Sequence, residues 1–193
     1  IMDNIKDYIK VFNVLDTKQC QNILNILNGY DWEKHKWNNY KTGKSTSEPT
    51  KELDITYPTK FLEKEMAKVI SNALLEYQNY FIFEERNKDE NLKYFLHKST
   101  PVRFNRYPTG TMMRKHYDHI HSIFEGENKG VPIVSIVGVL NDDYEGGDFV
   151  FNGNHEVKLK IGDILIFPSN FLYAHEVKEI TKGTRYSYVS WAF

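Results

Sequence analysis

The sequence contains a single cysteine, Cys20, so the chain cannot form a disulfide within itself. It also contains no apolar run of about 18 residues, the length at which a membrane-spanning helix would be expected. Neither charge dominates, because 25 Lys and Arg residues stand against 26 Asp and Glu residues. This balance argues against a protein that binds nucleic acid through its phosphates. Since the first residues also lack the apolar block of a signal peptide, we expect a cytoplasmic protein with no membrane partner.

The remaining composition is that of a folded protein of modest size. Of the 193 residues, 40% are hydrophobic and 26% are charged, which is typical of globular domains. This length is sufficient for one well-buried core and short for two ordinary domains. We therefore expect residues 1–193 to form a single domain.

The amino-terminal half, residues 1–100, shows mainly helical periodicity and is expected to supply support and a flap region. Asp16 and Gln19 form the pattern of a capping box before an apolar run that ends at Gly29. A second run, with apolar residues every three or four positions, covers residues 59–81. Between these helices, residues 31–54 are polar, with scattered aromatic residues. This segment is either a solvated connection or a flap over a site, and we favour the connection.

From Pro101 onward the pattern changes to alternation and short apolar runs, which indicate strands separated by turn residues. The expected strands cover residues 102–107, 133–140, 148–151, 157–159, 163–167 and 185–193, with one more around His116 and one around His175. About eight short strands at close spacing predict a jelly roll or barrel with the two helices on one outer face. The expected fold class is α+β, mainly β, with the jelly roll in residues 101–193.

Two histidines and one aspartate in the second half have the spacing of a metal site. His116 and Asp118 are two residues apart, so a strand would direct both to one face and Tyr117 to the other. His175 comes from a distant segment, which a closed double sheet can bring opposite this pair. Two imidazoles and one carboxylate occupy one face of an octahedral ion and leave three positions open, as in non-heme Fe(II) oxygenases. The open positions would admit O2 and a chelating cosubstrate to the same iron.

The last expected strand offers an anchor for such a cosubstrate. Arg185, Ser187, Val189 and Trp191 alternate onto one of its faces. A guanidinium holds a carboxylate with two parallel hydrogen bonds, and a hydroxyl adds a third. The alternative is an arginine in a surface ion pair. That alternative is weaker, because the face assignment also places Arg185 with the metal ligands.

Several segments resemble those of the 2-oxoglutarate/Fe(II)-dependent oxygenases, and most closely those of the prolyl 4-hydroxylase-like branch. The resemblance covers about residues 100–193 and extends to the amino-terminal half only in general helical layout. The matching segments are Phe104-Asn105-Arg106-Tyr107-Pro108-Thr109-Gly110 before His116-Tyr117-Asp118, Glu145-Gly146-Gly147-Asp148-Phe149, Gly162–Pro168, and His175-Glu176-Val177 followed by Gly183–Ser187.

This resemblance implies a double-stranded β-helix with supporting helices, and iron held by His116, Asp118 and His175. It places the distal carboxylate of 2-oxoglutarate on Arg185. The other residues that it implies are Tyr107, Asn105 and Ser187 in the cosubstrate pocket, and Trp191 and Arg106 near the substrate.

The implied reaction is a 2-oxoglutarate- and O2-dependent hydroxylation of a prolyl residue in a peptide or protein, with release of succinate and CO2. Fe(II) is the implied metal and ascorbate the implied reductant. The chain departs from the family where relatives carry a tyrosine in the third barrel strand that helps to hold the distal carboxylate. Here that strand reads Val137-Gly138-Val139, so Arg185 would have less help. Residues 119–130 would form a mobile lid.

Other functions remain open on the sequence alone. An AlkB-type nucleic-acid demethylase shares the Asn-x-Tyr entry motif, but those enzymes carry two arginines downstream of the third ligand, and this chain has only Arg185. Hydroxylation of a free amino acid or another small metabolite is a further alternative. A cupin-like metal-binding protein is the non-enzymatic alternative. A zinc hydrolase has the same ligand types but gives no reason for Arg185 and Ser187.

Overall fold

The computed structural model describes residues 4–39, 42–84, 95–96, 98–118 and 131–193. Its helical elements are η1 (Ile5–Tyr8), α1 (Thr17–Leu27), α2 (Lys60–Glu84) and η4 (Phe171–Tyr173). The strands of the amino-terminal half are β1 (Lys10–Asn13), β2 (Glu33–Lys34), β3 (Trp37–Asn39), β4 (Lys44–Thr46) and β5 (Asp54–Thr56). Those that follow are β6 (Arg103–Pro108), β7 (Met113–His116), β8 (Val134–Val139), β9 (Glu145–Gly146), β10 (Phe149–Phe151), β11 (His155–Val157), β12 (Asp163–Pro168), β13 (His175–Val177), β14 (Ile180–Lys182) and β15 (Thr184–Ala192).

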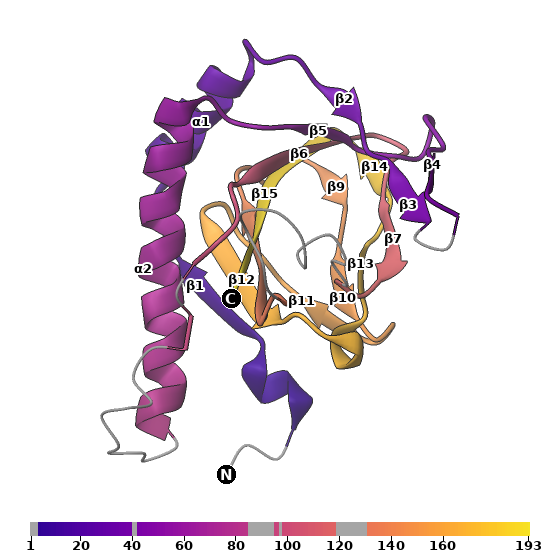
Figure 1. Ribbon diagram of the computed structural model, residues 1–193. Coiled ribbons are helices and arrows are strands. Elements are labelled where there is room, and N and C mark those ends of the chain that lie inside the picture. The colour runs from indigo at the N-terminus through magenta and orange to yellow at the C-terminus, as the bar shows by residue number, and fades with distance from the viewer. Residues whose placement is uncertain (1–3, 40–41, 85–94, 97, 119–130) are drawn as a thin grey trace.

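Two antiparallel sheets form the two layers of a barrel. The larger has the order β1-β12-β8-β15-β6-β5-β2, and the smaller has the order β11-β10-β13-β7. Figure 1 shows α1 and α2 together on one side of this barrel, with α2 standing along its length. In the part of the chain that is described, no helix is both long and apolar enough to cross a membrane. The mainly β jelly roll with two helices on one outer face is thus confirmed.

Strict alternation along the larger sheet separates an outer core from an inner one. On β12, Ile164 and Ile166 pack toward the helices, whereas Leu165 and Phe167 pack between the two sheets. This is the period of two that a strand imposes on its side chains. The outer core buries the apolar stripes of α1 and α2, and the inner core fills one part of the barrel. The metal ligands and the cavity beside them lie on the inner side.

The helices follow the sequence closely, but the amino-terminal strands do not. Asp16 caps α1 in a capping box with Gln19, as predicted, and α2 runs slightly beyond the predicted segment. The strands β1 and β5, however, extend the larger sheet by pairing with β12 and β6. The expectation that residues 1–100 are mainly helical was therefore incomplete. The strand expected at residues 157–159 lies at residues 155–157 instead.

Gly138 is required by the packing of the outer core. A Cβ atom at this position would lie 1.9 Å from the ring of Tyr188, which is completely buried. We expect Gly138→Ala to reduce the free energy of unfolding by about 1–3 kcal/mol, the usual cost of overpacking. Urea denaturation measures this loss. The matched control is Gly29→Ala, because the nearest atom to its new Cβ is 3.7 Å away; equal effects of the two substitutions would contradict the packing argument.

Candidate metal centre

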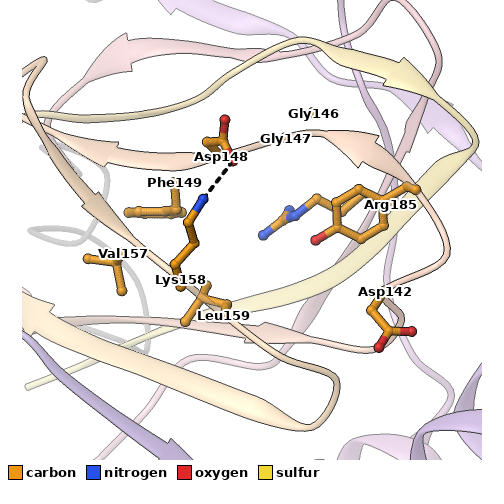
Figure 2. Close-up of a pocket in the computed structure, with 10 residues that line it drawn as sticks. Asp142, Gly146, Gly147, Asp148, Phe149, Val157, Lys158, Leu159 and Arg185 are labelled. Atoms are coloured by element: carbon orange, nitrogen blue, oxygen red, sulfur yellow. Dashed lines mark ion pairs between the residues drawn. The ribbon is translucent and has the colours of Figure 1, made fainter.

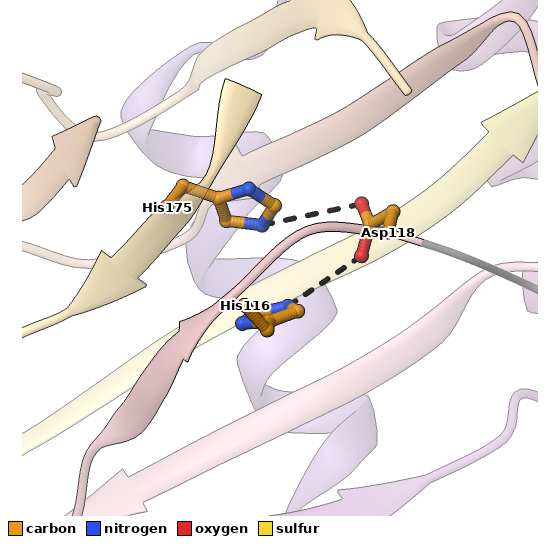
Figure 3. Close-up of side chains that lie close together, drawn as sticks. All are labelled: His116, Asp118 and His175. Carbon is orange, nitrogen blue, oxygen red and sulfur yellow. Dashed lines mark ion pairs between the residues drawn. The ribbon is translucent and has the colours of Figure 1, made fainter. Parts of the chain in front are cut away.

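The structure brings together the three side chains that the sequence analysis selected as metal ligands. β7 ends at His116, and Asp118 follows two residues later. His175 opens β13 and pairs directly with His116 across the two strands. One ligand atom from each residue lies within 4.8 Å of the others, and Figure 3 shows both imidazoles adjoining the Asp118 carboxylate. The sequence analysis expected Asp118 to lie within the same strand as His116. In the structure, it lies beyond the end of β7.

Backbone carbonyl groups orient both imidazoles. Nδ1 of His116 lies 2.7 Å from the carbonyl oxygen of Arg114, and Nδ1 of His175 lies 2.9 Å from that of Tyr173. Because a carbonyl oxygen only accepts, each Nδ1 donates its proton, and each Nε2 keeps its lone pair. These Nε2 atoms lie 3.5 and 4.0 Å from the Asp118 oxygens. The tautomer that a metal requires is therefore set by the backbone.

A serine on β8 orients the carboxylate. The hydroxyl of Ser135 donates to Oδ2 of Asp118 at 2.5 Å and lies 2.9 Å from the hydroxyl of Ser169. Ser135 is 1% exposed, so this contact is shielded from water. The sequence analysis did not select Ser135, although a lone hydroxyl within the apolar run Val134–Val139 was a signal of a buried polar contact.

The protonation states at this cluster suit a cation. Burial alone would raise the pKa of Asp118, but its contacts with His116 and His175 and the hydrogen bond from Ser135 hold it well below its usual value. Burial lowers the pKa of His175 to about 4. At neutral pH, Asp118 is ionised and His175 is neutral, which are the forms that coordinate a metal. Two imidazoles and one carboxylate with three open positions match the facial triad of Fe(II).

The low pKa of His175 predicts that the metal-free protein loses stability in acid. An unfolded histidine titrates near pH 6.5, whereas folded His175 titrates near 4. Between these values the unfolded chain binds a proton that the folded chain does not, so unfolding becomes easier as the pH falls. At pH 5 this term costs about 2 kcal/mol relative to pH 8. Urea denaturation in chelator measures it, and His175→Gln should remove this part of the slope; an unchanged slope would contradict the assignment.

Arg185 carries a buried positive charge with no carboxylate beside it. It is 1% exposed, and its Nη1 donates to Oγ of Ser187 at 3.1 Å. Its Nε has no hydrogen-bond partner, and no ion pair joins Arg185 to a carboxylate within the described ranges. Figure 2 shows the guanidinium directed into a pocket that Phe149 also lines. A buried, unpaired guanidinium is costly, so this pocket is suited to an anion.

Tyr107 places a phenol beside Arg185, on the side of the metal-site cavity. It lies opposite Arg185 in the β6–β15 pairing, and its ring centroid is 5.1 Å from Cζ of Arg185. Burial raises its pKa, so the hydroxyl keeps its proton. The tyrosine that relatives carry in the third barrel strand is absent here, where that strand reads Val137-Gly138-Val139. Tyr107 supplies a phenol from β6 instead, on the other side of β15. A guanidinium and two hydroxyl groups therefore fit the distal carboxylate of 2-oxoglutarate.

Residues 31–54 form one wall of the site. The expectation of a solvated connection was wrong, because His35, Lys36 and Trp37 line the metal-site cavity of about 440 Å³. The ring of Trp37 lies 5.5 Å from that of His116, nearly perpendicular to it. The segment thus contacts a metal ligand directly.

A buried carboxylate holds this wall in place. The side chain of Glu52 is 2% exposed and accepts a hydrogen bond from Nε1 of Trp37 at 2.9 Å. Arg114, on β7, pairs with the same carboxylate at 2.5 Å. Glu52 therefore ties the wall to the strand that carries His116. Neither Glu52 nor Trp37 was selected from the sequence.

The two arginines of β6 occupy opposite faces of the sheet. Arg106 was expected near the substrate, but it forms an ion pair with Asp54 at 2.9 Å and lies over the ring of Trp32. It does not line the metal-site cavity. Alternation along the strand directs Arg103, Asn105 and Tyr107 into that cavity instead. Trp191, also expected near the substrate, does line it.

The remaining sequence expectation near the site concerns residues 119–130. The lid expected there lies outside the residues that the structure describes.

Comparison with known proteins finds a family model that matches the part of the chain with the metal centre. The model of the 2OG-Fe(II) oxygenase superfamily matches residues 102–193. Over these residues, the chain is similar to that superfamily. The match includes His116, Asp118, His175 and Arg185, so the metal centre and the anion pocket both lie within the oxygenase region.

Curated relatives point to one branch of the superfamily. A PKHD-type hydroxylase of Acinetobacter baumannii is 39% identical over 101 residues, which are 49% of this chain and 44% of the relative. A PKHD-type hydroxylase of Stenotrophomonas maltophilia is 32% identical over 135 residues, 67% of this chain and 55% of the relative. The chain thus spans about half the length of the curated relatives it matches.

Solved structures share the fold. A Trichoplax adhaerens prolyl hydroxylase, in complex with a peptide of the hypoxia inducible factor oxygen degradation domain, has a TM-score of 0.66 at 18% identity, covering 96% of this chain and 83% of that one. A Pseudomonas putida prolyl-4-hydroxylase has a TM-score of 0.60 at 17% identity, covering 96% and 92%. The double-stranded β-helix expected for this chain is therefore confirmed.

Proposed function

We propose that this protein is an Fe(II)- and 2-oxoglutarate-dependent hydroxylase of a prolyl residue in a peptide or protein. The observation that carries the proposal is the pairing of two sites in one barrel. Phe149 connects them, because its ring stacks on that of His175 at 5.3 Å and also lines the pocket of Arg185. A diacid that chelates a metal at one end needs a cation at the other, and this arrangement provides both.

Each group of residues has a defined task in this reaction. His116, Asp118 and His175 would hold Fe(II), and Arg185 with its neighbouring hydroxyl groups would hold 2-oxoglutarate. When bound, these groups supply the activation of O2 that leads to hydroxylation, succinate and CO2. The protein fixes the geometry and excludes water from one side of the site.

The assignment of a prolyl substrate rests on the relatives and on the character of the cavity. Trp37 and Trp191 line the metal-site cavity, together with Tyr57, which is 57% exposed. Aromatic surfaces bind proline-rich segments in several recognition domains, because such segments are already extended and rigid. The PKHD-type relatives and the prolyl hydroxylase structures support the same substrate class.

Turnover with defined substrates tests the proposal. The protein is incubated with Fe(II), 2-oxoglutarate and ascorbate under 18O2, with a panel of proline-containing peptides. We expect succinate and a peptide product that has gained one labelled oxygen. Release of formaldehyde from methylated oligonucleotides would contradict the prolyl assignment. Absence of succinate with peptides, amino acids and nucleotides alike would contradict the assignment as an oxygenase and favour a binding protein.

A further inference from the structure

Two of the residues that line one wall of the metal-site cavity carry buried hydrogen-bond donors that have no acceptor. Nδ2 of Asn105 and Nε1 of Trp191 are both buried and without a partner. Asn105 is 1% exposed, and its Oδ1 accepts a hydrogen bond from Nε of Arg103 at 3.1 Å. Buried donors of this kind cost free energy unless a partner arrives. The wall is therefore incomplete without an acceptor.

Arg103 gives this wall a positive charge. Its Cζ lies 5.6 Å from the ring centroid of Trp191, so the guanidinium packs along the indole. Within the described ranges no ion pair joins Arg103 to a carboxylate, in contrast to Arg106 on the other face, which is paired with Asp54. The guanidinium thus retains donors for a ligand.

The residues that line the cavity carry more positive charge than the metal and the cosubstrate would neutralise. Asp118 is the one acidic residue among the described lining residues, and a metal would engage it. A dianionic 2-oxoglutarate with Fe(II), Asp118 and the cationic Arg185 sums to zero. Arg103 and the exposed Lys36 then remain unbalanced in the cavity. A cavity with surplus positive charge favours an anionic ligand.

We propose that Arg103, Asn105 and Trp191 bind a carboxylate of the substrate, an inference that rests on the proposed function and names its substrate class. The substrate is accordingly acidic near the hydroxylated carbon. The carboxylate comes either from an acidic side chain beside the target proline or from the α-carboxylate of a free or terminal residue. In both cases a guanidinium, an amide and an indole N–H donate to its oxygens.

The part of this wall formed by Arg103 and Trp191 is distinct from the pocket of Arg185, and Asn105, which lies opposite Ser187, stands between the two. Arg103 precedes Tyr107 by four residues on β6, which separates their backbone positions by roughly 13 Å along the strand. Tyr107 lies opposite Arg185, whereas Arg103 lies opposite Val189. Trp191 pairs with Ser135, which holds Asp118. The wall is therefore at the metal end of the barrel, where a substrate must lie.

Binding measurements test the wall without turnover. Wild type is loaded with Zn(II) and 2-oxoglutarate, and its tryptophan fluorescence is titrated with L-proline, L-prolinamide and blocked dipeptides. The dipeptides are acetyl-Glu-Pro-amide and acetyl-Pro-Glu-amide, with their Gln counterparts. We expect at least one acid to bind roughly ten- to a hundredfold more tightly than its amide, as for a charge-assisted contact. Equal affinity for acids and amides throughout would overturn the inference.

Variants assign the preference to Arg103. Arg103→Gln should abolish the preference for the acid, and Arg103→Lys should retain part of it. The matched control is Lys68→Gln, which removes an equal charge from an exposed site on α2 and should retain the full preference. If proline shows the preference, the source is an α-carboxylate; if a Glu peptide shows it, the source is a side chain. If Arg103→Gln instead raised the Kd of 2-oxoglutarate and left the Kd of the acid unchanged, the inference would be overturned. Arg103 would then bind the cosubstrate.

Turnover separates this inference from the proposed function. Formation of succinate without added substrate reports on the oxygenase itself, and the control Lys68→Gln, on the exposed face of α2, should leave it within about twofold of wild type. Wild type should also show a lower KM for the preferred acid than for its amide. If no succinate forms under any condition, the proposed function fails, and the binding preference still decides whether the wall holds a carboxylate.

Discussion

Replacement of Asp118 with alanine is expected to lower turnover by about a thousandfold or more and to leave the fold intact. Asp118 is the only carboxylate among the three ligand residues, and its loss leaves two neutral imidazoles to hold the cation. Loss of an outer partner of a metal ligand alone costs roughly 10–100-fold, so loss of the ligand itself should cost more. Succinate formation at saturating 2-oxoglutarate measures the effect.

Two further variants make this result specific. Ser135→Ala removes only the hydroxyl that donates to Asp118, and it should weaken Fe(II) binding by roughly 10–100-fold. Asp31→Ala removes an exposed carboxylate outside the cavity and should have no effect. Activity of Asp118→Ala close to that of wild type would contradict the ligand assignment. An effect of Ser135→Ala equal to that of Asp118→Ala would indicate instead that both residues act on the fold.

Arg185→Gln is expected to raise the Kd of 2-oxoglutarate by about a hundredfold or more, with the affinity for Fe(II) nearly unchanged. The guanidinium is buried and lacks a carboxylate partner among the described residues. Truncation of one partner of a buried, hydrogen-bonded charge pair typically costs 2–5 kcal/mol of binding free energy, or roughly thirtyfold to several thousandfold. Calorimetric titration of the Zn(II)-loaded protein measures both affinities.

Stability separates a cosubstrate anchor from a structural arginine. Because an unpaired buried charge destabilises the folded state, Arg185→Gln should leave the metal-free protein at least as stable as wild type. It should also lose the increase in Tm that 2-oxoglutarate produces. Arg185→Lys keeps the charge but not the planar fork, so its affinity should be intermediate. A large loss of stability in Arg185→Gln without ligand would show that the arginine supports the fold.

The part of the site that lies on long, regular strands was predictable from the sequence. Arg185 and Ser187 share a face because β15 alternates without interruption, and the structure places both on the inner side. His116 and Asp118 were paired by their spacing. Strand alternation would also have corrected the placement of Arg106 near the substrate. Arg106 is adjacent to the inward-facing Tyr107 on β6 and therefore points to the other face of the sheet.

The wall formed by residues 31–54 was not predictable in this way. Its strands β2 and β3 are short, and β2 pairs with β5, which lies at least 20 residues later in the sequence. Glu52 contacts both Trp37 and Arg114, and Arg114 is 62 residues away from it, so no local periodicity records this contact. Polar composition suggested exposure, whereas the Glu52 carboxylate is buried and satisfied by donors from Trp37 and Arg114.

The fold was predictable in class but not in full extent. Apolar alternation identified most strands after Pro101. The strand β1 has only four residues and one exposed face, so its place beside β12 depends on tertiary pairing. Local propensity carries little information on such pairings.

A crystal structure of the protein with Fe(II) and 2-oxoglutarate, grown without oxygen, is the most direct test of the metal centre. We predict one ion at roughly 2.0–2.2 Å from Nε2 of His116, Nε2 of His175 and one oxygen of Asp118. The distal carboxylate of 2-oxoglutarate should lie on Arg185, with Tyr107 and Ser187 beside it. An ion bound elsewhere, or a 2-oxoglutarate whose distal carboxylate does not contact Arg185, would contradict the account.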